Sequence, residues 1–137
     1  MKKSLIWSVA VILIYGGLFL ATHLYLGNNP HKVTVIVDTS YEMANYEKMI
    51  HLKMLEIFSF RYSVFSLYTD KSAVYDWTRS PNTGRNLKFY GPDNFENLLS
   101  GPLKSQLEKS EKIFFLSNSK NAFQIKKAYK NVTIINF

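Results

Sequence analysis

The sequence predicts an α/β protein with a three-layer open sheet, mostly parallel with one antiparallel hairpin strand, preceded by one transmembrane helix. Two observations support this prediction. Short β-branched runs alternate with segments whose apolar residues recur every three or four positions, a pattern typical of strands and helices in a layered sheet. Before them, residues 5–26 form an apolar run that contains no Asp, Glu, Lys or Arg.

The apolar run, residues 5–26, has the length of a membrane-spanning helix. At 1.5 Å per residue it extends ~33 Å, which covers a hydrocarbon core of ~30 Å. Trp7 and Tyr25 lie near its two ends, where aromatic rings favour the membrane interface. Lys2 and Lys3 precede it, so the positive-inside rule predicts that residues 1–4 stay in the cytoplasm. We therefore expect a single pass of the cell membrane, with the remaining chain extracytoplasmic or periplasmic.

A cleaved signal peptide is the competing interpretation of this segment. Signal peptides have an apolar region of only ~7–15 residues followed by a small-x-small cleavage site. The run here is longer, and its end reads Ala21-Thr22-His23-Leu24-Tyr25, which lacks a clean site of this kind. We expect an uncleaved anchor, followed by a polar linker at residues 27–31, where Gly27 and Pro30 end the helix.

Composition narrows the possible functions of residues 32–137. The chain has no cysteine, which excludes disulfides, thiolate metal sites and a cysteine nucleophile. Its 17 Lys+Arg outnumber its 10 Asp+Glu, and the lysines are dense between residues 104 and 130. Such a density attracts anionic lipid headgroups or an acidic partner, although a solvated face explains it equally well. Nucleic acid is not expected as a partner, because a domain outside the cell membrane rarely meets it.

The first strand and helix follow the linker directly. Residues 33–37 are a short apolar run rich in β-branched side chains, which is typical of a strand buried on both faces. In residues 42–58, apolar side chains recur at helical spacing and make one helix face. These elements form the first half of a βαβ unit.

A hairpin and a long loop come next. Residues 62–68 and 73–77 have strand composition and are separated by a short turn, so we expect them to pair as a hairpin. Residues 78–93 contain two glycines and two prolines and read as a loop, with one extended piece at 87–90.

The last third of the chain alternates again. A helical pattern begins near Phe95, is interrupted by Gly101-Pro102 and resumes at Leu103. Residues 113–116 predict a buried strand, and residues 120–130 a short basic helix with Ala122, Ile125 and Tyr129 inward. The final strand is expected at residues 132–135. Because the sequence ends directly after it, we expect this strand to lie at an edge that a partner covers.

One motif occurs where ligands bind in α/β sheets, at the carboxyl end of a strand. The segment Val35-Ile36-Val37-Asp38-Thr39-Ser40 resembles the opening of a von Willebrand factor A (vWA) domain, whose metal motif is Asp-x-Ser-x-Ser. Residues 62–68 with 71–74 resemble the family's hairpin, and residues 112–118 resemble its fourth strand. The resemblance covers residues 32–137 and implies a vWA or Rossmann-like sheet that serves as a binding module.

The resemblance also implies a divalent cation, which hard oxygen ligands would make Mg²⁺. Asp38 and Ser40 match the motif, whereas Glu42 replaces its second serine and Asn118 stands where a carboxylate is expected. The family's loop threonine corresponds to Thr78 or Thr83. We therefore expect a degenerate metal site with Asp38 and Ser40 as candidate ligands, and no other cofactor. The candidate binding surface comprises Asp38, Thr39, Ser40, Glu42, Thr83 and Asn118.

A structural role explains the same residues without any ligand. Residues 39–42 have capping-box spacing, in which the Thr39 hydroxyl caps the helix and Glu42 reaches back to its amide. An ionised Asp38 would also favour the positive end of the helix. This alternative remains open at the level of sequence.

Catalysis is not expected from the residues present. The three histidines are scattered, and no phosphate-binding glycine loop occurs. A PIN-like nuclease also opens with a strand and Asp-Thr-Ser, but needs further carboxylates, and a dehalogenase-like phosphatase needs an acid where Ser40 stands. None of the remaining acids is expected at another strand's carboxyl end; the nearest are Glu42, Glu47, Asp70, Asp76, Asp93 and Glu96.

We therefore expect an accessory or assembly subunit of a membrane protein complex, held in lipid through residues 5–26 and docking other subunits through its vWA-like domain. A Mg²⁺-dependent nuclease or phosphatase using Asp38 is the alternative. A passive spacer on an anchor helix is the third possibility.

Overall fold

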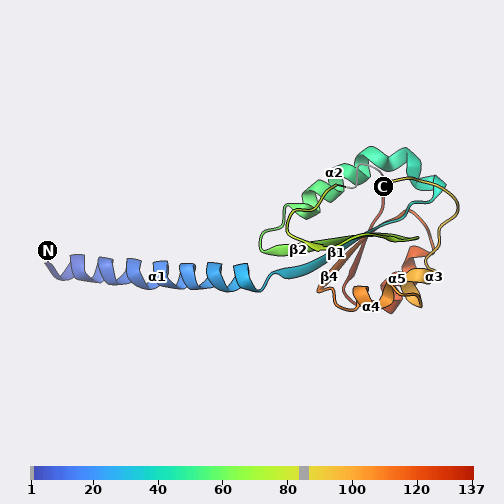
Figure 1. Ribbon diagram of the computed structural model, residues 1–137. Helices are drawn as coiled ribbons and strands as arrows, with labels where there is room; N and C mark the ends of the chain where they lie inside the picture. The colour runs from blue at the N-terminus through green and yellow to red at the C-terminus, as the bar shows by residue number, and fades with distance from the viewer. Residues whose placement is uncertain (1, 84–86) are drawn as a thin grey trace. The chain divides into compact units, whose positions relative to one another are not determined.

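The computed structural model describes residues 2–83 and 87–137, and comprises an N-terminal unit that ends at Pro30 and a domain, His31–Phe137. The first unit is one helix, α1 (Lys2–Asn28) (Figure 1). Its segment Ile6–Asn28 is long and apolar enough to cross a membrane by length and composition, a criterion that a signal sequence also meets. The predicted apolar helix is thus confirmed as a helix.

The domain is built on one five-stranded sheet of order β3-β2-β1-β4-β5. β1 pairs in parallel with β2 and β4, and β4 pairs in parallel with β5, whereas β2 and β3 are antiparallel. This arrangement confirms the expected mostly parallel sheet with one hairpin strand, and it places β5 at an edge. The strands are β1 (His31–Val37), β2 (Ser63–Thr69), β3 (Ala73–Thr78), β4 (Lys112–Leu116) and β5 (Val132–Ile135).

Helices cover both faces of the sheet, which confirms the three layers (Figure 1). On one face lie the 3-10 helix η1 (Tyr41–Tyr46) and α2 (Glu47–Phe58). On the other lie α3 (Glu96–Leu99), α4 (Lys104–Leu107) and α5 (Ala122–Ala128). Successive side chains of a strand point to opposite faces, so Val35 packs under α2 while Ile36 packs under α5. Residues 33–37 of the central strand β1 are therefore all buried, and Thr34 is the one polar side chain among them.

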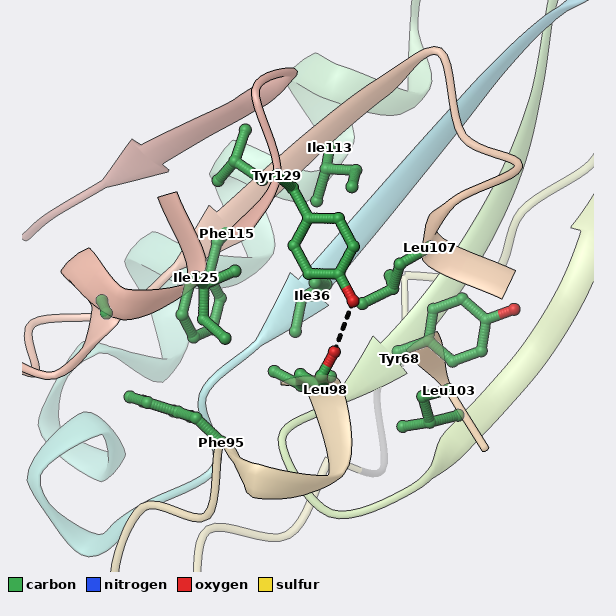
Figure 2. Close-up of a cluster of buried hydrophobic side chains, with 12 residues drawn as sticks. Ile36, Tyr68, Phe95, Leu98, Leu103, Leu107, Ile113, Phe115, Ile125 and Tyr129 are labelled. Atoms are coloured by element: carbon green, nitrogen blue, oxygen red, sulfur yellow. Dashed lines mark hydrogen bonds between the residues drawn. The ribbon is translucent and has the colours of Figure 1, made fainter. Parts of the chain in front are cut away.

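The core beneath α3, α4 and α5 contains aromatic as well as aliphatic side chains (Figure 2). Phe95 and Phe115 meet edge to face, with ring centroids 5.1 Å apart. The Tyr129 hydroxyl donates to the Leu98 carbonyl at 2.5 Å, which joins the end of α5 to α3. Ala122, Ile125 and Tyr129 are all buried, as the helical spacing predicted.

One segment differs from the prediction. The helix expected at residues 42–58 begins as the separate 3-10 turn η1 and becomes α-helical only at Glu47. Residues 87–90 belong to a loop, as expected, and the Tyr90 N–H donates to the Thr39 carbonyl at 2.8 Å. Residues 84–86 of the predicted loop lie outside the described residues.

Candidate functional site

A hollow of about 710 Å³ lies at the carboxyl ends of β1 and β4. The chain leaves these neighbouring strands in opposite directions, from β1 to η1 and α2 on one face and from β4 to α5 on the other. In α/β sheets, ligands bind in the crevice at such a reversal of strand order. The hollow is lined by Ser40, Tyr41, Glu42, Gly91, Pro92, Asp93, Asn118, Ser119, Lys120 and Asn121.

Asp38 lies beneath the hollow and joins two of its loops. Its side chain is fully buried directly after the end of β1. Oδ1 accepts the Ser40 N–H at 2.9 Å, and Oδ2 accepts the Ser117 hydroxyl at 2.6 Å. The carboxylate thus binds its own loop to the loop after β4, and both of its oxygens have protein partners.

Asp70 also joins two loops, on the other side of β1. It directly follows β2 and is fully buried. Its Oδ1 accepts the N–H and the hydroxyl of Thr39 at 2.9 and 2.7 Å, and its Oδ2 accepts the Asn94 N–H at 3.0 Å and the Lys71 ammonium at 2.9 Å. The expectation that no further acid lies at a strand's carboxyl end is therefore wrong. Strand β2 continues through Thr69, one residue beyond the predicted end, so Asp70 directly follows it.

Lys71 completes this buried group. Its ammonium also donates to the Thr39 hydroxyl at 3.1 Å and lies 4.9 Å from the centroid of the Tyr90 ring. A hydrogen-bonded pair of opposite charges is the form in which a buried charge is tolerated. Thr39, Asp70 and Lys71 therefore fix the loop after β1 against the loop before α3.

Backbone hydrogen bonds hold the loop before α3 against the loop after β1. The Tyr90 N–H donates to the Thr39 carbonyl, and the Tyr41 N–H donates to the Gly91 carbonyl at 3.1 Å. Gly91 has a φ of +70°, a conformation that glycine adopts without a steric penalty. The glycine lets the chain turn at the rim of the hollow.

The opposite wall is formed by the loop after β4. The Ser119 hydroxyl donates to Asp93 Oδ2 at 2.5 Å, and the Asn121 amide donates to the same oxygen at 3.4 Å. Asn118 is held by its amide oxygen, which accepts the Phe137 N–H at 2.7 Å. Tyr41, Glu42 and Lys120 remain exposed at the rim.

The capping-box interpretation is wrong. The residue preceding η1 is Ser40, which makes no side-chain capping bond, and the Thr39 hydroxyl donates to Asp70 instead. In a capping box the threonine hydroxyl would accept a backbone N–H, whereas here it donates to the buried Asp70 carboxylate. A hydrogen bond to an ionised acceptor is stronger than a neutral one, which accounts for the orientation of Thr39.

The predicted surface residues occupy different depths. Ser40, Glu42 and Asn118 line the hollow, while Asp38 and Thr39 are buried beneath it. Thr83 is not among the lining residues, and its neighbour Asn82 accepts the Tyr75 hydroxyl through its carbonyl. Sequence reasoning missed Tyr41, Asp93, Ser119 and Lys120, and gave Asp70 no role. Asp70 had a usable signal, because it follows a buried strand just as Asp38 does.

The described arrangement does not match the ligand set that the vWA resemblance implies. Both Asp38 oxygens accept protein hydrogen bonds, and the Asn118 oxygen accepts a backbone N–H. In residues 2–83 and 87–137, no three His, Asp or Glu side chains gather closely enough to hold a metal ion. Each Asp38 oxygen accepts one hydrogen bond and keeps a second lone pair, so a cation at Asp38 stays a prediction.

Comparison with protein-family models, with curated proteins and with solved structures finds no match to this chain.

Proposed function

We propose that the protein is a single-pass membrane protein whose domain, a degenerate vWA-like fold, is a docking module of a membrane protein complex. The observation that carries this proposal is the construction of the hollow. Its floor is fixed by buried carboxylates with protein partners on every oxygen, while its rim presents the exposed ring of Tyr41. A depression that combines polar side chains with an exposed aromatic ring suits a protein partner, because tyrosines are enriched at interface hot spots.

The same construction argues against catalysis by Asp38. A catalytic carboxylate must reach substrate, water or metal, whereas Asp38 and Asp70 are fully buried and bonded to protein donors. The alternative function is a Mg²⁺-dependent nuclease or phosphatase, in which Asp38 would bind the cation through the lone pairs that its two hydrogen bonds leave free.

The anchor is supported by the apolar segment Ile6–Asn28 together with the two lysines that precede it in the sequence. We propose that α1 stays uncleaved in the cell membrane, with its N-terminus in the cytoplasm and the domain outside. The chain has no cysteine, so Lys48→Cys introduces a unique thiol at an exposed position of α2, outside the lining of the hollow. This thiol should react with a membrane-impermeant reagent in intact cells, and protection from the reagent would refute the orientation.

Docking is tested with a charge-matched and ring-matched pair of variants. Tyr41→Ala with Lys120→Ala removes an aromatic ring and a lysine from the hollow, and Phe123→Ala with Lys126→Ala removes the same types from exposed positions on α5. Tyr41 and Phe123 are 69% and 65% exposed, so neither change should disturb folding. Tagged full-length chains are solubilised gently, and the co-purifying proteins are quantified.

The docking proposal predicts that specific partners fall at least about tenfold with the hollow variant and persist with the α5 variant. Equal retention in both variants would favour the passive spacer. Mg²⁺ is tested separately by thermal unfolding: stabilisation of the unmodified chain by MgCl₂ that disappears in Asp38→Ala would favour the metal-dependent alternative.

A further inference from the structure

Basic side chains gather at the amino edge of the sheet, which is the edge where the parallel strands β1, β2, β4 and β5 begin. Some of these Lys and Arg residues lie in the first two residues of β1 or β4. Others precede β2, β4 or β5 by two or three residues, and one directly follows the antiparallel β3. They are Lys32, Arg61, Arg79, Lys109, Lys112 and Lys130, and all six are exposed.

Two acids near this edge have partners of their own. Glu111 Oε2 lies 2.7 Å from His31 Nδ1, and Glu108 lies 4.0 Å from the Lys104 ammonium. The carboxyl edge has a different balance, because Asp38, Asp70 and Asp93 gather there. Among the residues that the structure describes, exposed cations therefore outnumber the acids at the amino edge.

A second hollow, of about 390 Å³, lies at this basic edge. Arg61 and Lys112 contribute exposed cations to its lining, and Val33 and Phe60 contribute apolar surface. The Lys112 ammonium lies 5.7 Å from the ring centroid of Phe60. The hollow is lined by His31, Val33, Phe60, Arg61, Ser63, Glu111 and Lys112.

Aromatic rings accompany the cations outside the hollow as well. The Lys32 ammonium lies 5.8 Å from the ring centroid of Trp77, near the end of β3. Trp, Tyr, Lys and Arg together are the side chains that favour the headgroup region of a membrane. A soluble anion would be held by the cations alone, whereas a lipid headgroup offers a phosphate for Arg61 and glycerol and upper acyl carbons for Phe60.

The chain also enters the domain at this edge. α1 ends at Asn28, and β1 begins at His31, so the amino edge is the one to which the apolar helix is covalently joined. We propose that this edge docks on anionic phospholipid headgroups, with Arg61 and Lys112 binding a lipid phosphate in the 390 Å³ hollow. This inference rests on the membrane anchoring proposed above, and it gives the domain a lipid partner distinct from the protein partner at the carboxyl edge.

Trp77 provides a local probe for the test. The sequence has two tryptophans, so Trp7→Phe leaves Trp77 as the only one. The full chain carrying this change is reconstituted into vesicles of phosphatidylcholine alone or with added phosphatidylglycerol, each containing a nitroxide-headgroup lipid as quencher. Both leaflets carry the same lipids, so the direction of insertion does not affect the comparison. We expect Trp77 to be quenched more strongly in the anionic vesicles, and high salt to remove the difference.

Removing the proposed phosphate ligands should abolish this response. Each Lys or Arg near a membrane surface changes partitioning about fivefold, so Arg61→Gln with Lys112→Gln should lower the ratio of docked to undocked domain about 25-fold. Lys48→Gln with Lys53→Gln removes the same charge from α2, away from this edge, and should leave the quenching unchanged.

Equal quenching in neutral and anionic vesicles, or equal quenching in the two double variants, would overturn the proposal. An acidic protein as the true partner would give the first of these results. A soluble anion as the true ligand would likewise leave the quenching of Trp77 equal in neutral and anionic vesicles, so the same measurement would overturn the proposal in that case. Flotation of the full chain with neutral vesicles reports on the anchor alone, so failure of the anchor is distinguished from failure of lipid docking.

Discussion

Replacing Asp70 by alanine should destabilise the domain by about 3–5 kcal/mol. The substitution removes the acceptor of four hydrogen bonds. The Thr39 N–H and the Lys71 ammonium lose this acceptor, and the Lys71 side chain is only 15% exposed, so water replaces it poorly. An unsatisfied buried N–H costs about 1–3 kcal/mol, and breaking a buried ion pair costs about 3–5 kcal/mol, with the two effects overlapping here. Asp38→Ala leaves two neutral donors, the Ser40 N–H and the Ser117 hydroxyl, without their acceptor and should cost less, about 1–3 kcal/mol.

The control is an exposed pair with similar geometry. Lys53 and Glu56 are joined at 2.6 Å on α2, so Glu56→Ala removes a carboxylate from a lysine just as Asp70→Ala does, but at the surface. That change should cost no more than about 0.5 kcal/mol. Urea unfolding of the full chain in detergent micelles, followed by Trp77 fluorescence in the Trp7→Phe background, measures all three variants. A cost for Asp70→Ala within 1 kcal/mol of that for Glu56→Ala would refute the assignment of Asp70 as the element that fixes the loops.

Two further predictions concern buried tyrosines. Burial, with the adjacent Asp76 carboxylate, raises the pKa of Tyr68 to about 12. Because the folded pKa lies above the unfolded value of about 10, the neutral hydroxyl stabilises the fold fully below pH 10, and at most about 2–3 kcal/mol of this stabilisation is lost as the pH rises through 12; urea unfolding should show a smaller loss in Tyr68→Phe than in the unmodified chain, with Tyr75 and Tyr129, whose pKa values burial also raises, accounting for the remainder. Tyr129→Phe removes the buried hydrogen bond to the Leu98 carbonyl and should lower the free energy of unfolding by about 1–2 kcal/mol, whereas Tyr41→Phe, at an exposed ring, should leave it unchanged.

The fold was predictable because local patterns and tertiary packing agree along most of the chain. The strand at residues 33–37 is a continuous apolar run because β1 is the central strand, and the helix near residues 120–130 places Ala122, Ile125 and Tyr129 inward at helical spacing. The helix near residues 42–58 was misjudged at its start, because apolar spacing does not distinguish a 3-10 turn from the first turn of an α-helix. Met43 is buried in either case.

The site was less predictable, because its polar contacts join residues far apart in the sequence. The capping-box spacing of residues 39–42 is a local signal, but the Thr39 hydroxyl binds Asp70, 31 residues away. Asp38 similarly binds Ser117, 79 residues away. No spacing rule encodes such pairs, since they exist only once β1, β2 and β4 are aligned. What the sequence does offer is an acid directly after each of two buried strands, and parallel strands end at a common edge.

The floor and the rim of the carboxyl-edge hollow are separable, because different residues build them. Asp70→Ala weakens the floor, so it should lower both stability and the retention of partners, since the loops bearing Tyr41 and Asp93 lose their common anchor. Tyr41→Ala with Lys120→Ala changes only exposed side chains and should lower partner retention at unchanged stability. If the hollow were only a result of loop packing, Asp70→Ala would still lower the stability, but neither variant would lower the retention of partners. The joint pattern of the two variants therefore distinguishes a docking site from a well-packed loop junction, which neither variant does alone.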